Sequence, residues 1–158
     1  MKIIHYGGLG TALRLLLAQL DGELAQIYEA EESEFRPRFY PVFQLLLETG
    51  HASVSEIASS LQVSQPAATQ TLVEMKRLGF VSYEAGSDRR ERIVRLTPHA
   101  LATAESLRPT WIAIGEAAAQ LDRELSAPLS MILDEAIAAL TRKSFPDRIS
   151  QYRRPKEE

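Results

Sequence analysis

The residues whose types and spacing could support chemistry are concentrated between Lys76 and Arg95. This segment holds six bases and three acids, which gives it a local charge of +3. Because the whole chain carries −3, the remaining residues together carry −6. A cationic segment in an otherwise acidic chain favours contact with a polyanion, since each phosphate that a base neutralises releases counterions. A charged loop that only keeps a surface solvated is the alternative interpretation.

Polar side chains that suit duplex DNA stand just before this cationic segment. Gln65 and Gln70 carry amides that can pair with adenine in two hydrogen bonds, and the hydroxyls of Ser64 and Thr69 can contact a base edge or a phosphate. A helix that begins at Ser64 also directs its N-terminal amides at a phosphate. On its own this pattern fits the solvated face of any helix. Followed by a cationic segment, it favours contact with nucleic acid.

Signals for an enzyme are weak. Lys2–Tyr6 followed by Gly7–Gly10 imitates a strand that enters a dinucleotide-binding loop, but Leu13 stands where the third glycine is needed. The sequence has no phosphate-binding loop with Gly-Lys-Ser/Thr and no nucleophile elbow. Its histidines lack the spacing of metal ligands; they are His5, His51 and His99. We therefore expect no enzymatic activity, no cofactor and no metal site.

The composition describes an ordinary globular protein of 158 residues, of which 45% are apolar. This is the size of one domain, or of a domain with an oligomerisation extension. The chain has no cysteine, which excludes disulfides, zinc–thiolate sites and thiol redox sensing. The apolar runs are too short to cross a bilayer, and the N-terminus lacks the pattern of a signal peptide. We expect a cytoplasmic protein without a membrane partner.

Capping signals predict three short helices before the cationic segment. The first begins near Phe39 and ends at Gly50. The second begins at Ser53, where Ser53-Val54-Ser55-Glu56 has the spacing of a capping box. The third begins at Ser64 with Pro66 in its first turn, where a missing N–H costs nothing. It ends at Gly79, and the spacing of its apolar residues places Ala68, Leu72 and Met75 in the core.

The period then changes to that of strands. Residues 80–83 and 92–96 predict a two-stranded hairpin with a long charged tip. A short helix, a tight turn, a second helix and a β-hairpin form the winged version of the helix-turn-helix motif. The expected fold is therefore mostly α with a small β-hairpin.

Both ends of the chain carry long amphipathic helices that a lone winged helix does not need. The first helix carries an apolar stripe from Leu13 to Ile27. The second helix starts after Thr97, and we expect a kink in it at Pro109. The third helix follows Ser126, and its apolar residues are expected to face inward. These stripes must be buried against each other or against a second copy of the chain. We expect terminal helical regions at 1–34 and 98–144, which are dimerisation helices if a second copy covers them, a DNA-binding winged helix at 35–97 and a loosely ordered tail at 145–158.

The sequence resembles the MarR family of winged helix-turn-helix transcriptional regulators. The most specific match is the segment from Asp88 to Thr97, which fits the family's wing signature of D-x-R, five residues, then L-T. Residues 64–81 are similar to the family's recognition helix and first wing strand, and 53–63 to the preceding helix. Residues 35–43 resemble a sub-branch that is sometimes fused to an acetyltransferase domain. No such segment occurs in these 158 residues, so we do not expect that activity.

The resemblance implies site residues position by position. It assigns Arg90 to the minor groove and Arg89 and Arg92 to phosphates, while Asp88 orients Arg90 or pairs with Arg77. The DNA-binding residues that we expect are Ser64, Gln65, Pro66, Thr69, Gln70, Thr71, Arg77, Arg89, Arg90 and Arg92.

The resemblance also implies an assembly and a mode of regulation. It predicts a homodimer that binds an inverted-repeat operator as a transcriptional regulator, most often a repressor, and a pocket for a small aromatic or amphipathic effector. The candidate pocket residues are Tyr28, Phe39, Tyr40, Phe43 and Trp111. Because aromatic residues at helical spacing are usually core residues, the core is the favoured interpretation of each. A winged helix that binds protein instead of DNA remains the alternative.

Overall fold

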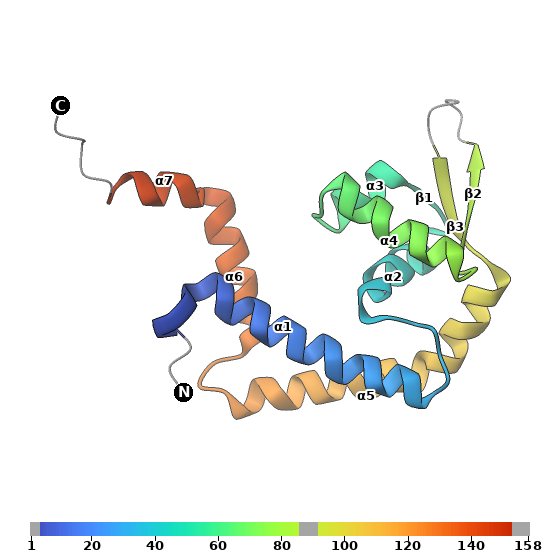
Figure 1. Ribbon diagram of the computed structural model, residues 1–158, viewed down its shortest axis with the longest axis horizontal. Coiled ribbons are helices and arrows are strands. Elements are labelled where there is room, and N and C mark those ends of the chain that lie inside the picture. The colour runs from blue at the N-terminus through green and yellow to red at the C-terminus, as the bar shows by residue number, and fades with distance from the viewer. Residues whose placement is uncertain (1–3, 86–91, 153–158) are drawn as a thin grey trace. The chain divides into compact units, whose positions relative to one another are not determined.

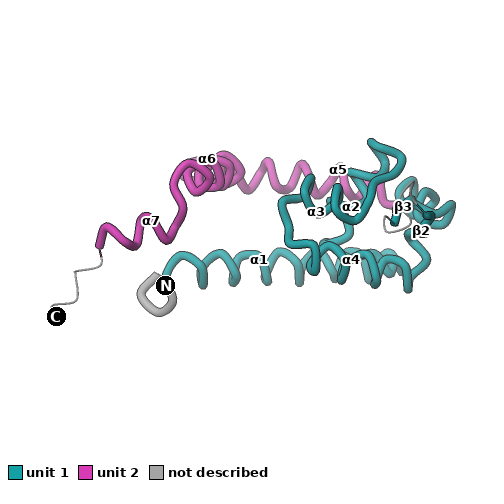
Figure 2. The backbone as a smooth tube through the Cα atoms, turned by 90° about the horizontal axis from the view of Figure 1, so that it is seen from above, with its two compact units in different colours: residues 1–106 teal, residues 107–158 magenta. Residues whose placement is uncertain are grey.

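The computed structural model describes residues 4–85 and 92–152. The chain divides into two compact units, residues 1–106 and residues 107–158, which Figure 2 distinguishes by colour. None of the helices within the described ranges is both long and apolar enough to cross a membrane.

Unit 1 is built around a cluster of short helices and a small sheet (Figure 1). A long helix, α1 (Ile4–Ala30), precedes them and is broken at Gly8, whose φ of +67° is a conformation that glycine adopts without strain. The elements that follow α1 are the 3-10 turn η1 (Pro37–Phe39) and the helices α2 (Tyr40–Thr49), α3 (Val54–Ser60) and α4 (Gln65–Arg77).

The predicted caps are confirmed. The hydroxyl of Ser53 accepts a hydrogen bond from the backbone N–H of Glu56, whose carboxylate accepts one from the N–H of Ser53, so α3 begins with a complete capping box. Ser64 caps α4 by accepting from the N–H of Ala67. Gly50 and Gly79 follow α2 and α4 with φ near +75°, the left-handed conformation that ends helices.

The sheet contains one strand more than the sequence predicted. Strands β2 (Val81–Ala85) and β3 (Arg92–Leu96) form the expected antiparallel hairpin, which we call the wing. The additional strand, β1 (Ala52–Ser53), pairs with the other edge of β3, so the order is β1-β3-β2. The periodicity of the sequence cannot reveal a strand of two residues. This strand forms because Ala52 and Ser53 pair with the edge of β3 that β2 leaves free. Ser53 therefore serves both as the end of a strand and as a helix cap.

An aromatic cluster lies at the centre of unit 1. Phe35 makes edge-to-face contacts with Tyr28 and Phe43, with ring centroids 4.9 Å apart in each pair, and Phe43 lies 5.4 Å from Phe80. His99 stacks on Phe80 from the start of helix α5 (Pro98–Glu124). The predicted inward residues of α4 are confirmed as core residues; Ala68, Leu72 and Met75 are all buried. This core fixes α4 against the sheet.

The apolar stripe of α1 is largely exposed in the single chain. Leu13, Leu17 and Ile27 each leave more than 40% of their surface accessible, whereas Tyr28 is buried. Only the C-terminal end of α1 is therefore held by the core of unit 1.

Helix α5 continues from unit 1 into unit 2 and passes through Pro109 without interruption. Unit 2 also contains α6 (Leu129–Arg142) and α7 (Phe145–Ser150). The carboxylate of Asp122 accepts hydrogen bonds from the N–H groups of Leu129 and Ser130, which caps α6 from α5.

The apolar residues of α6 are not buried in the single chain, where Ile132, Leu133, Ile137 and Leu140 are 38–53% exposed. Burial of this stripe against a second copy of the chain stays a prediction. One sequence expectation about unit 2 needs correction. The tail was expected to be loosely ordered, but residues 145–150 form α7, because Ser144 caps this helix by accepting from the N–H of Asp147.

Candidate nucleic-acid interface

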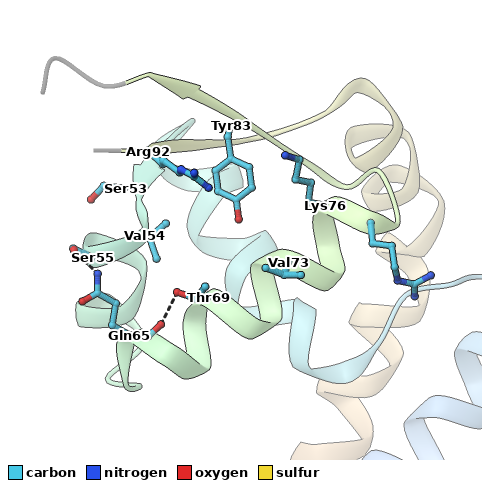
Figure 3. Close-up of a pocket in the computed structure, with 10 residues that line it drawn as sticks. Ser53, Val54, Ser55, Gln65, Thr69, Val73, Lys76, Tyr83 and Arg92 are labelled. Atoms are coloured by element: carbon cyan, nitrogen blue, oxygen red, sulfur yellow. Dashed lines mark hydrogen bonds between the residues drawn. The ribbon is translucent and has the colours of Figure 1, made fainter. Parts of the chain in front are cut away.

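A hollow of about 640 Å³ lies between α3, α4 and the wing in unit 1 (Figure 3). We call it the α4 hollow. Its walls come from the first turn of α3, from one side of α4 and from the two wing strands. The residues that line it are Ser53, Val54, Ser55, Gln65, Thr69, Val73, Lys76, Arg77, Tyr83 and Arg92. Three of them carry positive charge and none is acidic, so the charge of the α4 hollow is complementary to that of an anion or an anionic surface.

Two polar side chains of α4 are held in place at one end of the α4 hollow. The amide nitrogen of Gln65 donates to the hydroxyl of Ser55 at 3.2 Å, and the hydroxyl of Thr69 donates to the carbonyl of Gln65 at 2.8 Å (Figure 3). Gln65 keeps its amide oxygen and one N–H, the pair of groups that recognises adenine. Thr69 keeps its oxygen as an acceptor. The helix therefore presents partly oriented hydrogen-bonding groups to the solvent.

The cations of the α4 hollow come from two elements. Lys76 and Arg77 occupy the last turn of α4, and Arg92 begins β3. Pairing within the wing explains why Arg92 is close to α4: Arg92 is opposite Ala85, and Tyr83 is opposite Val94, so Arg92 and Tyr83 are diagonal neighbours on one face of the wing. Tyr83 lies between this arginine and Lys76.

The acids near the α4 hollow are engaged elsewhere. Glu84 pairs with Arg95 across the wing, at 2.9 Å. Glu74 lies on α4 but pairs with Arg36, at 2.9 Å, and with Arg38. In the part of the chain that the structure describes, no carboxylate lies within 4 Å of the charged groups of Lys76, Arg77 or Arg92. The positive charge of the α4 hollow is therefore not neutralised by these groups.

The structure brings four predicted DNA-binding residues together in the α4 hollow: Gln65, Thr69, Arg77 and Arg92. Ser64, Pro66 and Gln70 are exposed on α4 but do not line the hollow, and Thr71 is half-buried. The predicted wing-tip residues Asp88, Arg89 and Arg90 lie outside the described residues.

Six further residues line the α4 hollow and were not predicted as site residues: Ser53, Val54, Ser55, Val73, Lys76 and Tyr83. For Lys76 and Val73 a signal was present, because residues 65, 69, 73 and 76 follow helical spacing on one side of α4. For Tyr83 and Val54 the deciding feature is the position of the wing and of α3, which the sequence pattern does not specify.

The candidate effector residues of unit 1 are mainly core residues. Tyr28, Phe39 and Phe43 are at most 2% exposed and belong to the aromatic cluster, whereas Tyr40 is 39% exposed. Trp111 belongs to unit 2. A second hollow, of about 370 Å³, is lined by the end of α1 and the segment after it, where Glu29, Glu32 and Glu34 make it acidic. Among the described residues no group of three or more His, Cys, Asp or Glu side chains could hold a metal ion.

The fold was compared with known proteins. No protein-family model matches the sequence, and no curated protein matches it. Solved structures do match. The M. tuberculosis transcriptional regulator MOSR in complex with DNA is 19% identical, with a TM-score of 0.67 over 84% of this chain and 94% of that chain. A mutant of E. coli MarR complexed with operator DNA is 17% identical, with a TM-score of 0.66 over 89% of this chain and 98% of that chain.

A third similar structure is NMB1585, a MarR family regulator from Neisseria meningitidis. It is 18% identical, with a TM-score of 0.59 over 97% of this chain and all of that chain. At these identities the similarity establishes the fold. The chain has the winged-helix fold of MarR-family regulators, several of which are solved bound to DNA.

Proposed function

We propose that this protein is a sequence-specific DNA-binding transcriptional regulator of the MarR type, without catalytic activity, that acts in the cytoplasm. The observation that carries the proposal is the α4 hollow, which combines three cations, no acid and the oriented side chains of Gln65 and Thr69. A helix about 10–12 Å across fits the major groove, where amides and hydroxyls distinguish base pairs. The similarity of the fold to regulators solved with DNA supports the same conclusion.

In this proposal α4 enters the major groove and the wing follows the adjacent backbone. Gln65 and Thr69 contact base edges, while Lys76, Arg77 and Arg92 contact phosphates. Arg90 probes the neighbouring minor groove, a role that rests on the resemblance of the Asp88–Thr97 segment to the family's wing signature.

The proposal includes a homodimer. Exposed apolar side chains line α1 and α6, and none of the residues of α6 is buried in the single chain. Helices of this kind are covered by another surface in a stable protein. A twofold dimer places two α4 helices about one turn of DNA apart, which corresponds to an inverted-repeat operator.

Repression and release by a small aromatic or amphipathic effector complete the proposal and rest on the resemblance. Tyr40 is the most exposed of the aromatic candidates in unit 1 and is the side chain through which such a ligand could reach the cluster. A ligand releases DNA only if it favours one arrangement of the dimer over another. The proposal also places the chain in the sub-branch of the family that residues 35–43 resemble.

The experiment that tests the function is selection of duplexes from a random DNA library by the full chain. We expect an inverted-repeat consensus with half-sites one helical turn apart. A matched selection with Gln65→Ala should relax the preference at one position of each half-site, by about 1–3 kcal/mol of discrimination. Enrichment of no consensus, with no binding to any duplex at low salt, would overturn the proposal and favour a winged helix that binds protein.

A further inference from the structure

The side chain of Tyr83 lies between two cations at the edge of the α4 hollow. The ammonium nitrogen of Lys76 is 5.0 Å from the centroid of the Tyr83 ring, and the guanidinium carbon of Arg92 is 5.9 Å from it. Both distances are within the range of cation–π attraction. Figure 3 shows the ring between the two side chains, with its hydroxyl directed into the hollow toward α4. One aromatic ring therefore contacts both cations.

Among the described residues, the two cations beside the Tyr83 ring have no negative charge to balance them. Two like charges repel one another when they share a ring, and within the described ranges neither has a carboxylate partner. Within the described residues of the wing strands the acid is Glu84, and it is paired with Arg95 at 2.9 Å. An anion at the mouth of the hollow, between the two side chains, removes this repulsion and completes the arrangement.

We propose that Tyr83 is a positioning residue that holds Lys76 and Arg92 as one clamp for a single backbone phosphate of the DNA. The proposal rests on the proposed function and adds to it a positioning residue, Tyr83, and a single phosphate that Lys76 and Arg92 share. The ring orders two long side chains before DNA arrives, so that less conformational entropy is lost on binding. Lys76 comes from α4 and Arg92 from the wing, so the clamp fixes the wing and the recognition helix on the same phosphate.

The chemistry of the hydroxyl is consistent with this role. Burial raises the pKa of Tyr83, and the nearby charge of Arg92 lowers it by a smaller amount. The phenol is therefore protonated at physiological pH, so it can donate a hydrogen bond to a phosphate instead of repelling it.

The test uses the full chain and the duplex obtained by selection. Each phosphate of one half-site is replaced in turn by an uncharged methylphosphonate, and the affinity is measured for wild type, Lys76→Gln and Arg92→Gln. We expect one phosphate whose neutralisation weakens wild type but has little further effect on either variant, because both variants have already lost the same contact. Arg123→Gln, which removes an exposed cation from the end of α5, is the matched control and should keep the wild-type sensitivity.

Substitutions of Tyr83 complete the test. Tyr83→Leu removes the ring and should weaken binding roughly five- to tenfold, while Tyr83→Phe keeps the ring and should restore most of the affinity. The methylphosphonate comparison does not depend on a variant of Tyr83, so it tests the shared phosphate even if Tyr83→Leu unfolds.

The outcomes distinguish this inference from the proposed function. The clamp would be overturned if Lys76→Gln and Arg92→Gln each became insensitive to methylphosphonate substitution at a different phosphate, or if neither became insensitive at any phosphate. DNA binding itself would still stand. Wild type that binds no duplex in a salt-sensitive way would overturn the proposed function and the clamp together.

Discussion

At the scale of single residues, Glu74 joins α4 to the segment before α2. Its carboxylate pairs with Arg36 and with Arg38, and its side chain is only 18% exposed. Because the arginines are about half exposed, these ion pairs stabilise the fold less than buried ion pairs do. We expect Glu74→Gln to lower the free energy of unfolding by about 1 kcal/mol. Urea denaturation at low salt measures this loss.

The control for this prediction is Glu48→Gln, which removes an exposed carboxylate from α2. The free energy of unfolding of the control should stay within about 0.5 kcal/mol of wild type. The loss caused by Glu74→Gln should shrink in high salt, because screening weakens exposed ion pairs. Equal stability of Glu74→Gln and wild type at low salt would contradict the prediction.

Val73 is an apolar residue on the exposed side of α4. It is 59% exposed and lines the α4 hollow, four residues after Thr69. An apolar side chain at such a position contacts the methyl group of a thymine in the major groove. We expect one thymine of the selected half-site to lose affinity when it is replaced by uracil, which lacks that methyl group.

The matched variant is Val73→Ala, which should bind the thymine and uracil duplexes with nearly equal affinity. The expected difference for wild type is roughly 0.8 kcal/mol, the value of one buried methyl or methylene group. If uracil at each thymine position in turn leaves wild-type binding unchanged, Val73 does not read a methyl group.

At the scale of elements, the capping box of α3 links the sheet to the helix-turn-helix. Ser53 is 3% exposed and ends β1, and its hydroxyl caps α3. Loss of an N-cap costs about 1 kcal/mol, so Ser53→Ala should lower the free energy of unfolding by that amount. Chemical denaturation of Ser53→Ala beside Ser59→Ala, an exposed serine of the same helix, checks the prediction; equal losses would contradict it.

The same cap predicts a pH dependence. The backbone N–H of Ser53, followed by its hydroxyl, holds the pKa of Glu56 below its ordinary value. Because the pKa is lower in the folded state, the stabilisation is fully present above the ordinary range of a glutamate and is lost as the pH falls through the lowered value. Thermal unfolding of wild type and Glu56→Gln across this acid range should show a smaller decline for the variant; parallel curves would count against it.

Much of the element structure could be predicted because it depends on local signals. Ser64, Pro66 and Gly79 specify the ends of α4, and the bounds of β3 agree with the prediction. Strand β1 could not be predicted, because two residues become a strand only where the edge of β3 is free. Helix α7 was missed although Ser144 and Asp147, three residues apart, carry a capping signal.

The residues of the site also divide into those that local sequence signals specify and those that depend on tertiary contacts. The outer face of α4 follows from helical spacing, and so Gln65, Thr69 and Arg77 could be selected from the sequence. Tyr83 could not, because its contacts with Lys76 and Arg92 arise only when the wing packs beside α4. Such residues can be identified only when the three-dimensional structure is known, because their contacts join elements that are distant in the sequence.

At the scale of the whole molecule, the exposed apolar face of α6 predicts the homodimer. Leu133 lies on this face, whereas Ala138 lies on the opposite side of the helix by its spacing. We expect wild type to sediment as a dimer at micromolar concentration, Leu133→Glu to shift toward monomer and Ala138→Glu to remain a dimer. A monomeric wild type, or equal masses for the two variants, would contradict the assembly.

The central claim is that the cations of the α4 hollow bind the backbone of DNA. The most direct measurement is the affinity of the full chain for the selected duplex across a salt series of about 50 to 200 mM, analysed as log Kd against log salt. The comparison is between wild type, a variant with Lys76, Arg77 and Arg92 changed to Gln, and a control with Arg14, Arg123 and Arg142 changed to Gln.

For wild type we expect a steep linear slope. In the variant of the α4 hollow we expect a slope lower by about two per protomer, because Lys76 and Arg92 share one phosphate and Arg77 contacts another, and in the control we expect an unchanged slope. An affinity of wild type that does not vary with salt, or equal slopes for the two triple variants, would contradict the central claim.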